Sequence, residues 1–272
     1  MARVTVWRNP GALLRWASVA IVAFHVLAFG LWSPGSDARI YYDVELETFG
    51  RGEIFGTSFT YSPAAAWWLQ PLQALPFEAF RTLVVAVNMA GFVFLIGPVF
   101  ATIILLAQLL PVWMEFQQAN INFALGAALV LGFRSAGWYA FPLLTKVTPG
   151  IGLAWFAFRR EWRSIATAGV ASLLLAVPSL VLHASAWPVW IESLVANAGA
   201  DAQIGAPIAL RAVLAAALVG WGAMTDRPWT VPIAAALVAH VNSSGWLIGL
   251  AAVPLYLDRR RARTQGELVA ST

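Results

Sequence analysis

The chain contains no cysteine, and only 11% of its 272 residues are charged. The lack of cysteine excludes disulfides, thiolate nucleophiles and thiolate metal ligands. Soluble domains carry about 25% charged residues, so this charge content excludes an ordinary water-soluble domain. The three histidines, His25, His183 and His240, lie far apart and lack the paired spacing of a metal site. We therefore expect neither a metal nor another cofactor.

Apolar residues, by contrast, make up 60% of the chain, and the mean hydropathy is +0.73. A chain this apolar requires lipid as its solvent. In lipid every backbone polar group must be hydrogen-bonded within the protein, and no alternation typical of a barrel occurs, so we expect helices. The expected fold class is an all-α, polytopic transmembrane bundle of about 8–10 membrane segments, forming one domain over residues 1–272.

Basic residues lie mostly in short segments between the apolar runs, where they set orientation. This placement accounts for a sequence pI near 10.0 without a nucleic acid partner. Three arginines precede the first apolar run and four follow the last one, so we expect both termini in the cytoplasm. The expected full spans are 16–33, 80–97, 99–113, 121–133, 164–183, 207–223, 229–241 and 245–257.

Residues 34–76 are expected to form an extracytoplasmic loop. Its apolar part, 63–76, is too short to span the membrane and carries the paired Trp67 and Trp68, which is typical of interfacial helices. Its polar part, 34–62, holds five of the thirteen acidic residues of the chain. The acidic residues of this loop are therefore candidates for catalysis or binding, and the alternative is that they only keep the loop in water.

Residues 135–158 are expected to form a broken-helix hairpin. Arg134 and Arg159 flank it and should both be cytoplasmic, while Pro149 and Gly150 near its midpoint disfavour a continuous helix. Each arm of about 11 residues reaches about 16 Å, roughly half the hydrocarbon thickness. Such a hairpin must be shielded by protein or line a cavity.

Several polar residues lie within or against apolar spans, where they are costly and usually functional. They include Asn120, Asn122, Lys146 and Arg211. Lys146 is the only lysine of the chain, and its compact ammonium suits a phosphate as a point charge. Arg211 is a second candidate for the same anion. For both Lys146 and Arg211, the alternative is an ion pair with Asp201 or Glu192.

Asp37 opens the first outer loop and is a candidate general base. It is placed to deprotonate an acceptor hydroxyl while the anomeric carbon of a lipid-linked sugar develops positive charge. The departing phosphate then needs a cation, which Lys146 or Arg211 would supply. Asp43 is a rival to Asp37, six residues further along the chain.

Short motifs in the first 165 residues resemble one known family. The motifs are Asp37-Ala-Arg-Ile-Tyr41, Gly52-Glu-Ile-Phe55, Phe59-Thr-Tyr61-Ser-Pro63, Ala119-Asn120-Ile-Asn122, Lys146-Val-Thr148-Pro149 and Arg159-Arg160-Glu-Trp162-Arg163. In order and spacing they resemble glycosyltransferase family 87 of the GT-C superfamily, whose members use polyprenyl-phosphate-linked sugars. The sequence departs from the family pattern at Ala119, where glycine is common, and at Ser62, where proline is common.

The resemblance implies a GT-C-like fold and a bacterial plasma-membrane enzyme with its active site on the extracytoplasmic side. It implies that mannose, or a similar sugar, is transferred to a cell-envelope lipid or glycan, with Asp37 as the catalytic base. The candidate donor- and substrate-binding residues are Lys146, Arg211, Tyr41, Asp43, Tyr61, Gln118, Asn120, Asn122, His240 and Asn242.

Two other functions remain open. A lipid or solute transporter or flippase is one, because broken helices line substrate paths in transporters. A non-catalytic assembly subunit with a transferase-like fold is the other, because the chain is short for the family. A cavity open only outward and toward lipid would favour the transferase, and a two-sided pathway would favour the transporter.

Overall fold

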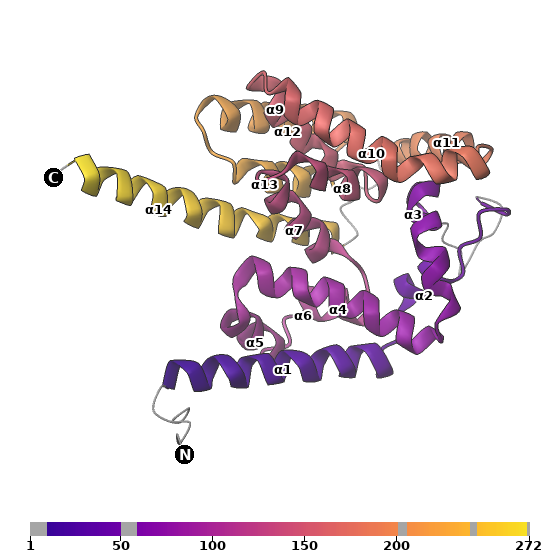
Figure 1. The fold of residues 1–272 in the computed structure, drawn as a ribbon, viewed down its shortest axis with the longest axis horizontal. Coiled ribbons are helices and arrows are strands. Elements are labelled where there is room, and N and C mark those ends of the chain that lie inside the picture. Colours follow the sequence, from indigo (N-terminus) through magenta and orange to yellow (C-terminus); the bar gives the residue numbers. More distant parts are fainter. Residues whose placement is uncertain (1–9, 50–58, 201–205, 240–243, 271–272) are drawn as a thin grey trace, which may run out of the picture.

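The computed structural model describes residues 10–49, 59–200, 206–239 and 244–270, and all regular structure in these ranges is helical (Figure 1). The first half contains α1 Pro10–Trp32, α2 Ser36–Tyr42, α3 Pro63–Leu69, η2 Gln70–Ala74, α4 Phe77–Ile96, α5 Pro98–Leu106, α6 Leu110–Gln117 and α7 Asn122–Gly132. The second half contains η3 Ala136–Tyr139, α8 Ala140–Leu144, η4 Thr148–Gly152, α9 Leu153–Phe158, α10 Trp162–Leu182, α11 Ala186–Ala200, α12 Ile208–Met224, α13 Thr230–Val238, η6 Ser244–Ala251 and α14 Ala252–Ala270.

Two hydrophobic cores lie side by side and share α7. Figure 1 shows α1, α4, α5 and α6 on one side of α7, and α8, α9, α10, α12 and α13 on the other. Phe123 of α7 belongs to the first core, with Phe92 and Phe116, whereas Leu129 of α7 belongs to the second, with Trp155. Different faces of α7 therefore pack into the two cores, and this helix joins the two halves of the molecule.

Within the described ranges, three helices are long and apolar enough to cross a membrane, Gly11–Trp32, Phe77–Ile96 and Trp162–Leu182, and a fourth span is possible if the bent pair Pro98–Leu106 and Leu110–Gln117 crosses as one. The shorter apolar helices among the described residues are Asn122–Gly132, Thr148–Phe158 and Ile208–Met224. In the best apolar windows of α1 and α10 only 17% of residues are buried, so most of their surface needs lipid around it. The expected all-α, polytopic membrane fold is confirmed.

The expected span at 99–113 is not one straight helix, because the chain turns by 95° between α5 and α6; the pair is a broken span or a re-entrant loop. Gln108 adopts a positive φ of 50° at the turn. Pro111 is the second residue of α6, in the first turn, where a proline is tolerated; inside a continuous helix it would remove one hydrogen bond and clash with the preceding turn. The bend directs α6 inward, and Glu115 on it is completely buried.

The expected hairpin at 135–158 consists of four short helical pieces, η3, α8, η4 and α9, and Lys146 lies between α8 and η4. In the segment 34–76, α2 precedes the undescribed residues 50–58, and α3 and η2 follow them. Ser62 caps α3 by accepting a hydrogen bond from the Ala65 N–H at 3.3 Å. The Ser62 hydroxyl also donates to the Leu144 carbonyl at 2.6 Å, which joins the loop to the hairpin.

Arg81 of α4 holds the end of α1 in place. Its buried guanidinium donates to the carbonyls of Gly30, Leu31 and Ser33 at 2.7, 2.9 and 2.6 Å. These carbonyls have no partner within the helix, so the arginine satisfies them. Gly35 follows with φ of 60°, and a Cβ there would lie 2.4 Å from Arg81 Cδ, so only glycine fits this turn into α2.

Arg81→Met is therefore expected to destabilise the protein by about 3 kcal/mol, because three buried carbonyls lose their donors. The thermal midpoint of the purified protein in detergent measures this loss. Arg134→Met, at an exposed arginine, is the matched control and should leave the midpoint unchanged. Equal midpoints for the two variants would contradict the capping role of Arg81.

Candidate active site

Six polar side chains meet between α2, α6, α7, the bend at residues 145–147 and the start of η6. We call them the polar cluster: Asp37, Glu115, Asn120, Asn122, Lys146 and Ser244. They come from parts of the sequence up to 207 residues apart. The cluster contains two carboxylates and one ammonium, and the surrounding helices are apolar.

The start of α2 is held against the turn that follows α6. The Asp37 and Ala38 N–H groups donate to the Gln118 carbonyl at 2.9 and 3.4 Å, and the Gly35 N–H donates to the Gln117 carbonyl at 3.0 Å. The next residue, Ala119, is buried and has a positive φ of 53°. Glycine adopts a positive φ without strain, which accounts for the glycine common at this position in the motif that Ala119-Asn120-Ile-Asn122 resembles.

Lys146 reaches the cluster from the hairpin bend. Its Nζ donates to Asn120 Oδ1 and to Asn122 Oδ1, both at 2.9 Å, and it lies 6.0 Å from the centre of the Tyr61 ring. An ammonium carries three N–H donors. Two of them fix the side chain on the asparagines, which leaves a third for a ligand oxygen.

Glu115 accepts more hydrogen bonds than any other side chain of the polar cluster, and it was not among the site residues predicted from the sequence. Its carboxylate accepts from the Asn122 N–H at 2.8 Å, from Asn122 Nδ2 at 2.9 Å and from Asn88 Nδ2 at 3.3 Å, and the Ser244 hydroxyl also donates to it. A lone carboxylate seven residues before Asn122 in an apolar stretch was the signal that could have identified it.

The start of α7 explains why a buried carboxylate is tolerated at this place. Asn88 Oδ1 accepts from the Phe123 and Ala124 N–H groups at 2.9 and 3.1 Å, beside the Asn122 N–H that Glu115 accepts. The first N–H groups of a helix have no partner within it and carry partial positive charge. Glu115 and Asn88 satisfy these groups, and Lys146 provides a nearby countercharge.

Two tyrosines form one wall of the site. The Tyr41 and Tyr61 hydroxyls lie 2.7 Å apart, and the Tyr41 hydroxyl donates to Asn120 Oδ1 at 3.5 Å. Burial raises the pKa of both hydroxyls well above the usual range. Both tyrosines are therefore neutral near pH 7 and act as hydrogen-bond donors rather than as bases.

The environment of Asp37 suits a base. Burial raises the pKa of its carboxyl to about 6, and the Glu115 carboxylate adds to this rise. The Lys146 ammonium and a hydrogen bond with the Asn120 side chain act in the opposite direction. A pKa near the working pH combines a mostly ionised carboxylate with adequate basicity, as general base catalysis requires.

The structure separates some other candidates from the cluster. Asp43 accepts a hydrogen bond from Arg39 Nε at 2.5 Å, so the rival aspartate sits in an ion pair. Arg211 is buried and donates to the carbonyls of Ala206, Val238 and Ala239 at 3.1, 3.4 and 2.7 Å, so it caps the end of α13.

Gln118 contributes its backbone carbonyl beneath Asp37. His240, Asn242 and Asp201 lie outside the described residues. The roles predicted for Arg211, His240 and Asn242 in substrate binding therefore stay predictions. In the described ranges, no three histidine, aspartate or glutamate side chains are grouped as metal ligands.

Comparison with known proteins identifies the family. The family model of glycosyltransferase family 87 matches residues 59–272, which is well over half of the chain. The chain has no match among curated proteins or solved structures. The matched part contains Glu115, Asn122 and Lys146, whereas Asp37 precedes it and is joined to it through Gln118 and Asn120. The protein belongs to glycosyltransferase family 87.

Proposed function

We propose that the protein transfers mannose or a similar sugar from a polyprenyl-phosphate donor to a cell-envelope lipid or glycan, with Asp37 as general base. One observation carries the proposal: a carboxylate and an ammonium lie beside the same asparagine. Asn120 and Lys146 both act on the Asp37 carboxyl and lower its pKa, and Lys146 Nζ lies 2.9 Å from Asn120 Oδ1. A base and a phosphate-binding cation are therefore adjacent, as sugar transfer from a phosphate leaving group needs.

In the proposed reaction an acceptor hydroxyl gives its proton to the Asp37 carboxylate while its oxygen bonds to the anomeric carbon. The bond between that carbon and the donor phosphate oxygen breaks, and the electron pair stays on the phosphate. The third N–H of Lys146 donates to this phosphate as its charge grows. Because Asn120 and Asn122 hold the ammonium in advance, little reorganisation accompanies charge development.

The direct test uses the purified protein with a radiolabelled polyprenyl-phosphate mannose and a lipid extract from a bacterial envelope as acceptor. We expect the label to move into the glycolipid or glycan fraction. A protein that moves intact donor between the leaflets of a vesicle without transferring the sugar would be a flippase. No transfer by the purified chain, restored by an added partner protein, would favour an assembly subunit.

Asp37 also predicts how sugar transfer depends on pH. Only the ionised carboxylate accepts a proton, so kcat/KM should fall as the pH drops below about 6, the value to which burial raises the Asp37 pKa. One pH unit below that value the loss should be about tenfold. Asp43→Asn should keep the same profile, and a fall that starts only near the ordinary aspartate value would contradict the assignment.

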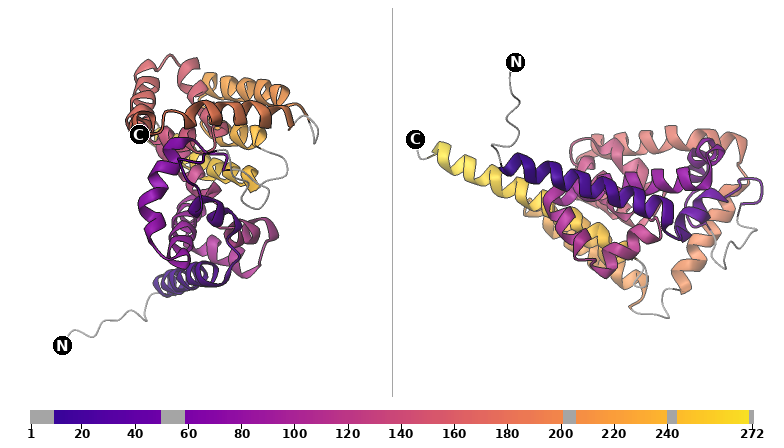
Figure 2. Two further views of the ribbon diagram at one scale, coloured as in Figure 1. Left: turned by 90° about the vertical axis from the view of Figure 1, so that its right-hand side faces the viewer. Right: turned by 90° about the horizontal axis from the view of Figure 1, so that it is seen from below.

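We place both termini in the cytoplasm and the polar cluster on the outer side of the plasma membrane. The start of α1 and the end of α14 lie at one end of the molecule, and α2, α3 and α11 lie at the other (Figures 1 and 2). Near the termini, Arg159 and Arg259 both pair with Asp226. Basic residues concentrated at one end support a cytoplasmic position for it.

The absence of cysteine makes this topology directly testable. Glu47→Cys in the outer loop and Thr264→Cys in α14 each introduce one thiol, at positions that are both exposed. A membrane-impermeant maleimide added to intact cells should label the first variant, and it should label the second only after permeabilisation. The reverse pattern would show that the protein is inserted with the opposite orientation.

A further inference from the structure

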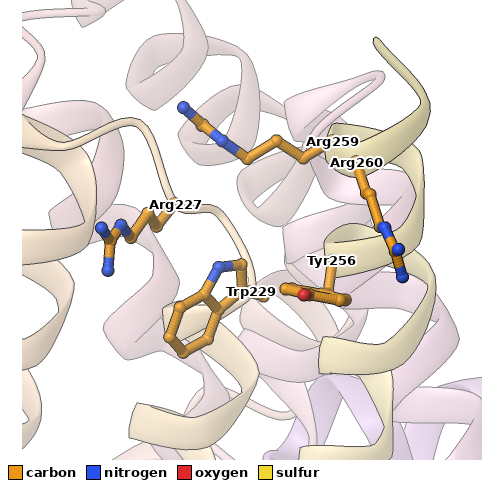
Figure 3. A pocket seen from close by; sticks show the side chains of 5 residues that line it. All are labelled: Arg227, Trp229, Tyr256, Arg259 and Arg260. Atoms are coloured by element: carbon orange, nitrogen blue, oxygen red, sulfur yellow. The ribbon is translucent and has the colours of Figure 1, made fainter. Parts of the chain in front are cut away.

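A second polar site lies at the end of the molecule that carries the termini. Arg227, Trp229, Tyr256, Arg259 and Arg260 line a cavity of about 290 Å³ between the α12–α13 connection and α14 (Figure 3). The rings of Trp229 and Tyr256 meet edge to face in its wall, with centroids 6.5 Å apart and planes at 76°. This site is built by residues that take no part in the polar cluster.

The cavity carries an excess of positive charge. Arg259 pairs with Asp226, which also contacts Arg159 at 3.4 Å. In the described part of the chain, no carboxylate lies within ion-pair distance of Arg227 or Arg260. The surroundings therefore favour an anionic ligand.

One donor at this site is buried without an acceptor. The Arg259 Nε–H has no hydrogen-bond partner among the described residues. A buried N–H without an acceptor is costly, so a small shift of this side chain toward an anionic ligand in the cavity would relieve that cost. Arg227 is oriented by its contact with Trp221, whose ring centre lies 4.6 Å from the guanidinium carbon.

The position of the cavity along α14 indicates what kind of anion binds there. The helix begins with the apolar residues 252–257 and continues with the charged residues 258–261, so it passes from lipid to water at the level of the cavity. Aromatic side chains such as Trp229 and Tyr256 are typical of the headgroup level. Anionic headgroups attract arginines placed at this level.

We propose that Arg227, Arg259 and Arg260, with Trp229 and Tyr256, form a binding site for the phosphate of an anionic phospholipid such as phosphatidylglycerol. Arginines supply charge-assisted hydrogen bonds to the phosphate oxygens, including the Arg259 Nε–H. The two aromatic rings pack against the glycerol. The space corresponds to roughly ten water molecules, which matches a glycerophosphate headgroup, while the acyl chains remain in the bilayer.

The test compares the wild-type protein with Arg227→Ala/Arg260→Ala, which spares Arg259 and its contact with Asp226. Arg134→Ala/Arg163→Ala removes the same charge from exposed arginines outside the cavity and is the matched control. Each protein is placed in nanodiscs of phosphatidylcholine with or without phosphatidylglycerol. Thermal stability and the phosphatidylglycerol retained in native mass spectra are measured, and neither readout depends on sugar transfer.

We expect phosphatidylglycerol to stabilise the wild type and the control and to remain bound to both. The cavity variant should bind it about 30-fold more weakly, since each arginine at a membrane surface contributes about 1 kcal/mol. A shift reproduced by soluble inorganic phosphate would identify free phosphate as a ligand of the same site. Equal retention by the wild type and the cavity variant, or equal losses in the cavity variant and the control, would overturn the proposal.

Discussion

Asp37→Asn is expected to lower the rate of sugar transfer by about 10²- to 10⁴-fold while the protein stays folded. The asparagine keeps the shape of the side chain but cannot accept a proton at neutral pH. Loss of a general base costs about 10²- to 10⁴-fold in rate. The measurement is the turnover of labelled polyprenyl-phosphate sugar by the purified variant in detergent.

The same variant is expected to be more stable than the wild type. Burial raises the pKa of Asp37 from 3.8 to about 6 in the folded protein, so the folded state holds a proton that the unfolded state loses between these values. Ionisation of Asp37 therefore reduces stability as the pH rises through this window, and above pH 6 the cost is at most about 3 kcal/mol. Replacement by a neutral amide removes this cost.

Asp43→Asn is the matched control, since Asp43 directly follows the same short helix and forms an ion pair with Arg39. It should retain turnover within a few-fold. Full activity of Asp37→Asn, or loss of activity in Asp43→Asn alone, would transfer the role of base to Asp43. An Asp37→Asn protein that is inactive because it is unfolded would show a lower thermal midpoint, which is the opposite of the expected rise.

Glu115→Gln is expected to cause the largest loss of stability, about 3 kcal/mol or more. In the wild type, Glu115 Oε2 accepts hydrogen bonds from Asn122 Nδ2 and from the Ser244 hydroxyl. In the variant an NH₂ group takes the place of this oxygen, so two donors face a third donor. The change also removes a negative charge near Lys146. The thermal midpoint in detergent measures the loss, and Glu78→Gln, at an exposed position on α4, is the control.

A separate readout shows whether Glu115 positions the site or only supports the fold. The Glu115 carboxylate helps to raise the pKa of Asp37, so its removal should move the acid limb of the pH–rate profile to lower pH. A purely structural role would lower the amount of folded enzyme and leave the limb in place. An unshifted limb in the fraction that folds would contradict the positioning role.

Much of the architecture could be predicted from the sequence. The high apolar content requires lipid and therefore helices, and Pro149 with Gly150 predicts the break beside Lys146 that lies between α8 and η4. Asn120, Asn122 and Lys146 stood out because polar groups in apolar stretches are costly. They do meet in one hydrogen-bonded cluster.

What the sequence alone determined is that these polar groups must have partners; the tertiary structure decided which partners they have. Arg211 stood out in the sequence as a candidate ligand-binding cation, and in the structure it donates to three backbone carbonyls. Arg81 does the same for carbonyls at the end of α1. Glu115 became a central residue only because α6 turns inward at a 95° bend. The physical reason is that a buried charge can be satisfied by a ligand, a side chain or a helix terminus, and only the packing of distant segments selects among them.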